Sequence, residues 1–257
     1  MTHPIFKESP LNQEQRQLMV DRGVWKEGCP VPLDRLNVVE FSYHNFKGEI
    51  CHDGQVVVMD AVALHVANIF RHLFLIRFPL CSAKPIEHFN GSDDDSMAAN
   101  NSSAFNYRKI AVDGNHALSI HSYGLAIDIN PVQNPYAGYF SKHPTKDCGT
   151  MEVWPTKGLE YMNRHNLRPG MVEEIIDTFA YNGFHIWGGD WNDLLDYHHF
   201  QTPRLMAELL AEMDARHAID FFDYYVLHPD KIKLEDGMIE DYKNGPNTFL
   251  RKYGIPL

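Results

Sequence analysis

An α+β fold is the class that the sequence predicts, and three observations support it. Segments with the period of a strand and segments with the period of a helix follow one another irregularly, which favours α+β over a doubly wound parallel sheet. The chain has 257 residues, 44% of them hydrophobic and 22% charged, which is typical of a globular protein with one sizeable core, in one domain or two. No stretch approaches the roughly 18 consecutive apolar residues of a membrane-spanning helix.

The N-terminal part is predicted to contain a helix followed by two strands. Ser9 and Pro10 have the pattern of an N-cap and a first-turn proline, which predicts a short helix that ends at about Arg22. Apolar and polar residues alternate over 39–43, as in a half-buried strand, and Val56–Met59 is expected to form a second strand.

A second helix and two further strands are expected in the middle of the chain. Asp60 could cap a helix that extends to about Arg77, with its apolar residues on one face. Ala104–Val112 and Leu125–Asn130 have the character of strands, and turn residues at Asp113–Gly114 lie between them.

Four segments complete the expected order of elements. Residues 131–168 are rich in Pro, Gly and Asn and predict a long loop, of the kind that often carries function. Met171–Asn182 has the periodicity of an amphipathic helix, and Phe184–Trp187 indicates a short strand. Residues 203–225 predict a last helix before a mixed tail.

Composition and charge exclude several classes of function. The net charge of −11 argues against binding to phosphate backbones, so no nucleic-acid partner is expected. The N-terminus has no basic flank followed by an apolar stretch, so no secretory signal is visible. The absence of a C-x-x-C pair disfavours a cysteine zinc cluster and leaves open whether any cysteines form disulfides. The four cysteines are Cys29, Cys51, Cys81 and Cys148.

The first segment with chemical character is Ser119–Asn130, with the sequence SIHSYGLAIDIN. Along the expected strand, Asp128 faces away from the neighbouring leucine and isoleucine residues, because side chains alternate between the two faces. Gly124 permits a turn that would bring His121 back beside Asp128. An imidazole and a carboxylate presented in this way suit a catalytic zinc ion, which takes nitrogen and oxygen ligands and keeps one position open.

Two further segments contain polar side chains of interest, Gly188–Phe200 and Asp93–Arg108. In Gly188–Phe200, His199 offers a third ligand, and Asp196 offers a carboxylate that could take a proton from a water molecule that the metal activates. His198 competes with His199, but on a strand the two side chains point to opposite faces, so only one of them can bind the metal. Arg108 has a planar guanidinium group that is suited to a carboxylate or carbonyl oxygen of a substrate.

Together these segments resemble the zinc peptidases that cleave bacterial cell-wall peptides. The family pattern S-x-H-x-x-G-x-A-x-D is complete at Ser119–Asp128, and Asp196–His199 is similar to its later acid-x-x-His element. One branch has the segments D-S-M-x-x-N-N-x-S-x-F-x-x-R and W-G-G-D-W, which are matched at Asp95–Arg108 and Trp187–Trp191. The family includes D-alanyl-D-alanine carboxypeptidases, vancomycin-resistance dipeptidases and phage L-alanyl-D-glutamate endopeptidases. The resemblance covers about residues 55–201.

The resemblance implies a metallopeptidase with the hedgehog/DD-peptidase type of fold, a small antiparallel sheet flanked by helices. It implies Zn²⁺ as the cofactor, Asp196 as the general base and acid, and Arg108 in contact with the substrate. The implied zinc ligands are His121, Asp128 and His199. A weaker set of substrate-binding residues is expected at Ser103, Ser119, Tyr123 and Trp187. Many relatives have Glu where this chain has Asp196, whose shorter arm alters its reach to the water.

The implied substrates are peptidoglycan stem peptides, cleaved at a D-Ala-D-Ala or an L-Ala-D-Glu bond, and the site of action would be the periplasm or the cell wall. Two other functions stay open, a catalytically silent zinc-containing wall-binding module of the same fold and a zinc amidase. For Arg108 the alternative is an ordinary salt bridge, and for Trp187 a place in the core. We expect an N-terminal extension at residues 1–54, the peptidase core at 55–201 and a C-terminal helical extension at 202–257.

Overall fold

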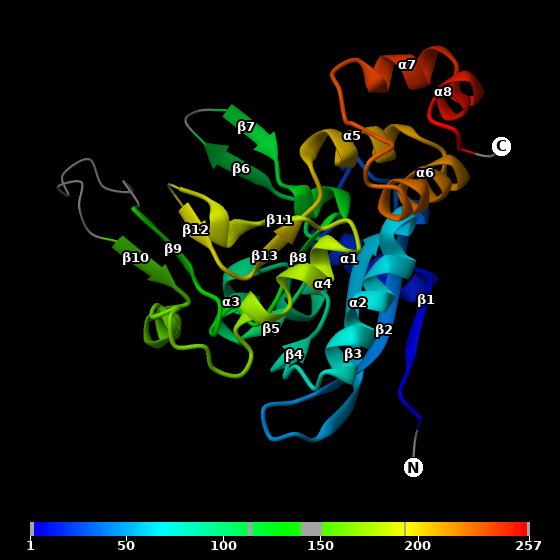
Figure 1. Cartoon of the computed structure of the whole chain (residues 1–257). Coiled ribbons are helices and arrows are strands. Elements are labelled where there is room, and N and C mark those ends of the chain that lie inside the picture. The colour runs from blue at the N-terminus through cyan, green and yellow to red at the C-terminus, as the bar shows by residue number, and fades with distance from the viewer. Residues whose placement is uncertain (1–2, 113–114, 140–150, 193, 256–257) are drawn as a thin grey trace.

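The structure is a computed structural model, which describes residues 3–112, 115–139, 151–192 and 194–255. It contains small sheets with helices between and beside them, so the predicted α+β class is confirmed (Figure 1). The strands are β1 (Phe6–Pro10), β2 (Leu36–His44), β3 (Ile50–Met59), β4 (Ser82–Ala83), β5 (Asn101–Ser102), β6 (Lys109–Val112), β7 (Asn115–Leu118), β8 (Ala126–Asp128), β9 (Tyr136–Tyr139), β10 (Met151–Trp154), β11 (Ile186–Trp187), β12 (Leu194–Asp196) and β13 (His199–Gln201). The α-helices are α1 (Gln13–Asp21), α2 (Ala63–Leu75), α3 (Asp93–Ala98), α4 (Ile176–Ala180), α5 (Arg204–Glu212), α6 (Ala215–Leu227), α7 (Met238–Asn244) and α8 (Pro246–Lys252).

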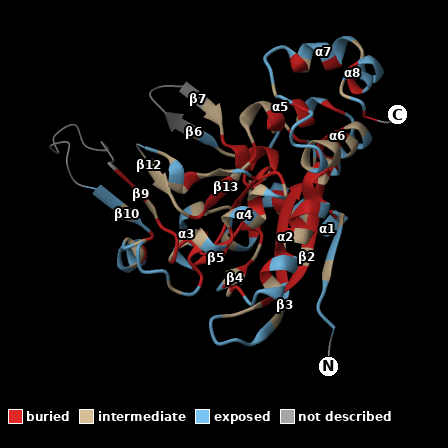
Figure 2. Ribbon diagram, in the orientation of Figure 1, coloured by how far each residue is buried: buried red, intermediate tan, exposed pale blue. Residues whose placement is uncertain are grey.

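The N-terminal sheet has the antiparallel order β1-β2-β3. Helix α2 packs on it, and the ring of Phe70 stacks on that of Phe41 with centroids 3.6 Å apart. Figure 2 shows that buried residues concentrate on β2, β3 and α2, which form the centre of the core. Strand β3 begins at Ile50, so the boundary expected between residues 54 and 55 falls within a strand, and residues 1–54 supply most of this sheet.

Two other three-stranded sheets contain three of the predicted site residues, Asp128, Asp196 and His199. Their antiparallel orders are β11-β13-β8 and β10-β9-β12. Buried Phe200 of β13 stacks on Phe179 of α4 with centroids 4.0 Å apart, so the first of these sheets is attached to the core through an aromatic pair. The short β4–β5 pair is parallel, and β6 and β7 form an antiparallel pair.

The helices α5–α8 gather at the end of the molecule where the C-terminus lies (Figure 1). Arg35, which precedes β2, connects them to the N-terminal sheet. Its Nε and Nη2 atoms donate to the carboxylate of Asp60 at 2.6 and 2.9 Å, and Nη1 donates to the carbonyl oxygen of Met213 at 2.6 Å. The side chains of Arg35 and Asp60 are 10% and 9% exposed. The N- and C-terminal segments therefore meet at a buried ion pair.

Two expected helix starts are wrong. Ser9 and Pro10 end β1, where they pair with β2 instead of opening a helix. The first helix begins after Asn12, whose side chain forms a capping box with Gln15. Asp60 does not cap α2, because its carboxylate is held by the buried arginine and a 3₁₀ turn precedes the helix. In both places a long-range partner decides the structure.

Several helices, strands and loops also differ in length from what the sequence predicts. The segment 131–168 contains β9 and β10, which pair with each other, and β9 also pairs with β12. The helix expected at 171–182 is reduced to a 3₁₀ turn and the five residues of α4. The helix expected at 203–225 is two helices, α5 and α6, with an aspartate cap before the second. Of the strand expected at 104–112 only β6 forms, and the turn at Asp113–Gly114 lies outside the described residues.

Two further expectations concern membranes and disulfides. In the described ranges, each helix is too short or too polar to cross a membrane. Cys29, Cys51 and Cys81 are free thiols, and Cys148 lies outside the described residues.

Candidate metal centre

His121 lies in a tight 3₁₀ turn, Ile120–Tyr123, whose ends are set by two residues of the motif. Ser119 caps the turn, because its hydroxyl accepts a hydrogen bond from the backbone nitrogen of His121 at 3.3 Å. Gly124 ends the turn with φ of +68°, and a Cβ atom there would lie 2.5 Å from the backbone nitrogen of Met59. Glycine thus serves both the left-handed conformation and the close approach to β3, which places the His121 turn against the N-terminal sheet.

Strand pairing brings Asp128 and His199 together, although they are 71 positions apart. The two residues are directly opposite in the β8–β13 ladder. On the other edge of β8, the backbone groups of Asp128 exchange hydrogen bonds of 3.0 and 2.8 Å with those of Ser103. Asp128 and His199 are both buried. The position of the Asp128 backbone is therefore fixed from both sides.

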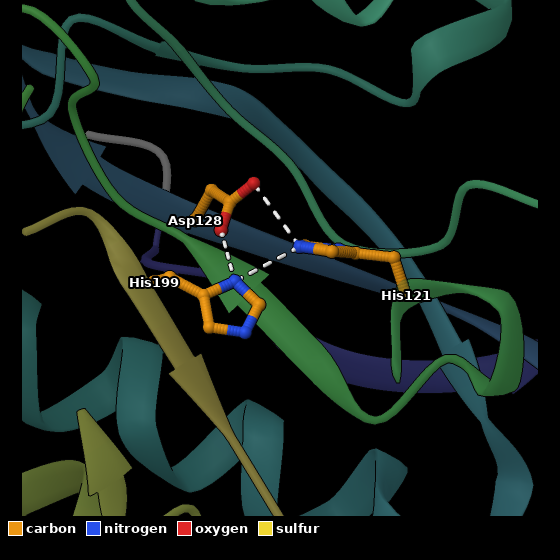
Figure 3. Close-up of side chains that lie close together, drawn as sticks. All are labelled: His121, Asp128 and His199. Carbon is orange, nitrogen blue, oxygen red and sulfur yellow. Dashed lines mark hydrogen bonds and ion pairs between the residues drawn. The ribbon is translucent and has the colours of Figure 1, made fainter. Parts of the chain in front are cut away.

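The side chains of His121, Asp128 and His199 converge (Figure 3). Nδ1 of His199 lies 3.0 Å from Oδ1 of Asp128, Nε2 of His121 lies 3.2 Å from Oδ2 of Asp128, and these two imidazole nitrogens are 3.1 Å apart. Donor atoms bound to zinc tetrahedrally at about 2.0 Å are about 3.3 Å apart. The three side chains could therefore hold a metal ion with little adjustment.

The outer nitrogens of both imidazoles face oxygen acceptors. Nδ1 of His121 donates to the carbonyl oxygen of Ala104 at 2.5 Å, and Nε2 of His199 donates to the side-chain oxygen of Gln201 at 2.8 Å. With protons on these atoms, the two inner nitrogens carry lone pairs and face each other beside a carboxylate. Metal-binding histidines typically fix their second nitrogen in this way, so the donor set fits a bound cation.

The buried carboxylate of Asp128 and the histidines around it shift each other's pKa values towards their charged forms. Burial alone would raise the pKa of Asp128, but His121, His198 and His199 hold that pKa well below its usual range. Burial lowers the pKa of His199, and the contact with Asp128 outweighs it and raises the pKa above the ordinary value. For His198 burial is likewise outweighed, by Asp196 and Asp128, and its pKa rises to about 10. Asp128 is therefore ionised, as a metal ligand must be.

A cavity of about 350 Å³ opens beside His199. Its wall contains three more of the predicted site residues, Asp196, Arg108 and Ser119. His121 and Asp128 are more deeply buried, at 2% exposure each. The arrangement places the cluster at the base of a space that is large enough for part of a peptide.

Asp196 ends β12, where it is directly opposite Tyr136 of β9. Its Oδ1 atom lies 3.0 Å from Nε2 of His198, at an ion-pair distance without the alignment of a hydrogen bond. This buried oxygen therefore has no hydrogen-bond partner in the described part of the chain. Gly188 packs against the same residue, because a Cβ atom there would lie 2.4 Å from the carbonyl oxygen of Asp196. The carboxylate can accept a proton from a molecule bound in the cavity.

Arg108 combines a salt bridge with a remaining buried donor. Its Nη2 atom lies 3.3 Å from Oδ2 of Asp93 and forms a salt bridge with it. Its Nε atom is buried and has no hydrogen-bond partner among the described residues. The hydroxyl of Ser122 accepts from the Arg108 backbone nitrogen at 3.0 Å and donates to its carbonyl oxygen at 2.9 Å. The backbone is thus fixed while Nε is available to a ligand.

The four weaker candidates lie in different places. Ser119 lines the cavity, whereas Ser103, Tyr123 and Trp187 lie outside its described lining. Ser103 pairs with the backbone of Asp128, and Tyr123 is buried in the His121 turn. Trp187 packs partly buried against the core and donates from Nε1 to the carbonyl oxygen of Tyr197 at 2.9 Å. These three residues belong to the framework around the site.

Several residues of the cavity wall were not predicted, among them Tyr136, Trp191, Gln201 and Arg204. Trp191 ends the W-G-G-D-W segment, and its ring lies 5.4 Å from that of His199, so the motif contained a signal for it. Tyr136 belongs to a segment that was expected to be a loop, and burial raises its pKa, with Asp196 acting in the same direction. Arg204 follows the last motif and has no sequence signal of its own.

One comparison with known protein families matches the part of the chain that contains most of this site. A family model described as D-alanyl-D-alanine carboxypeptidase matches residues 113–202, a segment that contains His121, Asp128, Asp196 and His199. No curated protein and no solved structure matches the chain. Over this segment the chain matches the D-alanyl-D-alanine carboxypeptidase family of peptidases, which supports the resemblance found in the sequence.

Proposed function

We propose that the chain is a zinc-dependent peptidase that hydrolyses peptide bonds in peptidoglycan stem peptides. The observation that carries this proposal is the convergence of His121, Asp128 and His199 beside a cavity that also contains Asp196 and Arg108. Two imidazoles and one carboxylate are a donor set that zinc takes in catalytic sites, with a fourth position left for water or substrate. The peptidase family of residues 113–202 supports the same activity.

In this proposal each residue has a defined role. Zinc bound by the three side chains would polarise the peptide carbonyl and lower the pKa of a water molecule towards about 7. Asp196 accepts a proton from the attacking water at Oδ1 and passes it to the nitrogen of the leaving amine. Arg108 donates from Nε to a carboxylate or carbonyl oxygen of the substrate. His198 orients Asp196, since its Nδ1 atom donates to the carbonyl oxygen of Asn134 at 2.8 Å while Nε2 faces the carboxylate.

The proposed bond is L-Ala-D-Glu or D-Ala-D-Ala. We favour the endopeptidase, because the W-G-G-D-W segment resembles a branch of the family and phage lysins share the metal pattern. The substrate implies action in the periplasm or the cell wall. Ser119 is the one of the four weaker candidates that we place in contact with the substrate, because it lines the cavity.

Digestion of purified peptidoglycan tests the proposal. The zinc-loaded protein should create new peptide termini at one bond of the stem peptide, which mass spectrometry identifies, and a chelator should abolish this until zinc is added back. New termini at the bond between sugar and peptide would show an amidase instead. No new termini, with about one zinc bound per chain, would favour the wall-binding module.

A further inference from the structure

We infer that Arg204 is a second carboxylate-binding residue of the cavity, so that the enzyme selects peptides with an acidic group in addition to the oxygen that Arg108 holds. The inference rests on the proposed function and specifies its substrate class. Arg204 begins α5 three residues after β13 ends at Gln201, and both residues line the cavity. It lies outside residues 113–202, the segment that the family model matches.

The guanidinium group of Arg204 is oriented but only partly used. Nη2 donates to the carbonyl oxygen of Leu118 at 2.9 Å. Nη1 lies 3.7 Å from Oε1 of Glu208, beyond hydrogen-bond distance, and both side chains are about two-fifths exposed, at 40% and 38%. Such an exposed ion pair contributes little to the free energy of folding. Because a guanidinium group has five N–H donors, several remain for a ligand after these contacts with the described residues.

Helix stability does not explain an arginine at this position. The first turn of a helix carries a partial positive charge, so acidic side chains are favoured there and a cation is unfavourable. The first turn of α5 contains no acidic residue, and Pro203 before it provides no side-chain cap. The placement of Arg204 is thus unfavourable for the helix and favourable for a ligand in the cavity.

Both arginines are hydrogen-bonded to one segment of the chain, Leu118–Ser119. The backbone nitrogen of Ser119 donates to the carbonyl oxygen of Arg108 at 3.0 Å, and Arg204 is anchored to Leu118, the residue before Ser119. Strands β6 and β7 pair here, with Lys109 opposite Leu118. Because Arg108, Ser119 and Arg204 line the same cavity, a peptide that lies along Ser119 would be close to both arginines.

Charge in the cavity supports an anionic group at Arg204. Arg108 is partly neutralised by Asp93 at 3.3 Å, and Asp196 faces His198 at 3.0 Å. The acid nearest to Arg204 in the described chain is Glu208, which is not part of the cavity lining. Because the chain as a whole carries a net charge of −11, an acidic peptide is attracted only where a local cation outweighs the general repulsion.

Paired stem peptides that differ in one group test the inference. The probes are two synthetic peptides that are identical except that the acidic residue carries a free carboxylate in one and a carboxamide in the other. Their dissociation constants are measured by calorimetry in a zinc-loaded Asp196→Asn background, which stops turnover. We expect the free acid to bind about tenfold more tightly than the amide, as a charge-assisted contact of a partly exposed arginine should give.

The variants separate a substrate contact from a general charge effect. Arg204→Gln should bring the affinity ratio of acid to amide close to one, and Arg204→Lys should keep part of it. Arg216→Gln is the matched control, because Arg216 also lies 3.7 Å from an acid one turn on, Asp220, but on the exposed surface of α6; it should keep the full ratio. Equal affinities in the parent protein, a preference that survives Arg204→Gln, or no measurable binding of either peptide would overturn the inference.

Cleavage of the same peptides by the wild-type protein distinguishes this inference from the proposed function. Binding preference without cleavage would leave Arg204 as a carboxylate site and reject the peptidase. Cleavage with no preference for the acid would retain the peptidase and reject the role of Arg204.

Discussion

Asp128 and His199 are directly opposite in the β8–β13 ladder, and Oδ1 of the aspartate lies 3.0 Å from Nδ1 of the histidine. The preceding residue, His198, lies just before the strand, and its Nδ1 atom contacts the carbonyl oxygen of Asn134. The histidine doublet is therefore divided between two environments. The ring of His199 joins His121 and Asp128 in the candidate metal centre, and the ring of His198 contacts the carboxylate of Asp196 and lies 3.9 Å from that of Asp128.

Single substitutions in the doublet should separate these environments. His199→Ala should lose most of the bound zinc and the activity, because it removes one of three ligands. His198→Ala should keep zinc, with an affinity loss of no more than about 10–100-fold, as for a residue outside the ligand set. Zinc per chain after dialysis, with circular dichroism as the check on folding, measures both. The opposite behaviour of the two variants would move the ligand to residue 198.

Asp196→Asn should retain zinc and fold but lower turnover by about 10²–10⁴-fold, because the amide cannot take the proton. Asp196→Glu should retain measurable activity, since many relatives have the longer acid at this place. Rates of muropeptide cleavage, zinc content and thermal stability are compared for both variants. Equal cleavage by the wild type and the Asn variant would remove Asp196 from the mechanism.

Gly188→Ala should displace Asp196 without a change in the ligand set. The added Cβ atom would lie 2.4 Å from the carbonyl oxygen of Asp196 and 2.8 Å from its Cβ atom, so β12 must shift. We expect kcat to fall by about tenfold or more, with zinc retained, because small displacements of a catalytic group strongly affect rate. Gly245→Ala is the control, since its Cβ atom would meet only ordinary contacts of 3.5 Å. Unchanged kcat in the Gly188 variant would show that β12 tolerates the shift.

Glu87 should make the protein less stable as the pH rises. It is 5% exposed, and burial raises the pKa of its carboxyl group from 4.5 to about 7. Between these values the native state keeps a proton that the unfolded chain releases, so the free energy of unfolding falls with increasing pH, by on the order of 3 kcal/mol in all. Glu87→Gln should remove this dependence and stabilise the protein at pH 8.

Denaturant unfolding of the wild type and the Glu87→Gln variant at pH 4.5, 6 and 8 measures the difference. Glu27→Gln, at an exposed position, provides the control for loss of one negative charge. If the Gln variant has the same advantage at every pH, the carboxyl group of Glu87 does not titrate in this range.

Two of the three residues of the candidate metal centre could be proposed from the sequence because their spacing is local. His121 and Asp128 are joined by one turn and one short strand, and the turn depends on Gly124. His199 is distant in sequence, but the family pattern supplied it. Arg204 and Tyr136 could not be found in this way, because their place in the cavity depends on how β9 and α5 pack, which no spacing encodes.

The fold class was predictable for a similar reason, and the element boundaries were not. Strand and helix periods identify β2, β3 and α2, whose residues pack on the core. At Ser9 and Pro10 a local helix signal is outweighed by pairing with β2. At residues 136–139 a segment next to turn-forming residues becomes β9, because β10 and β12 pair with its two edges.

The ion pair of Arg35 and Asp60 limits how the chemistry of this chain can be transplanted. A fragment that starts at residue 55 would lack Arg35 and leave a buried carboxylate without its partner, a situation that typically costs 3–5 kcal/mol. A fragment that ends at residue 201 would lack Met213, which accepts from the same guanidinium group, and also Arg204. The segment that bears the family pattern thus depends on packing and hydrogen bonds from residues on both sides of it in the chain. A transplant of the candidate metal centre must therefore include the parts of the chain that contain Arg35, Arg204 and Met213.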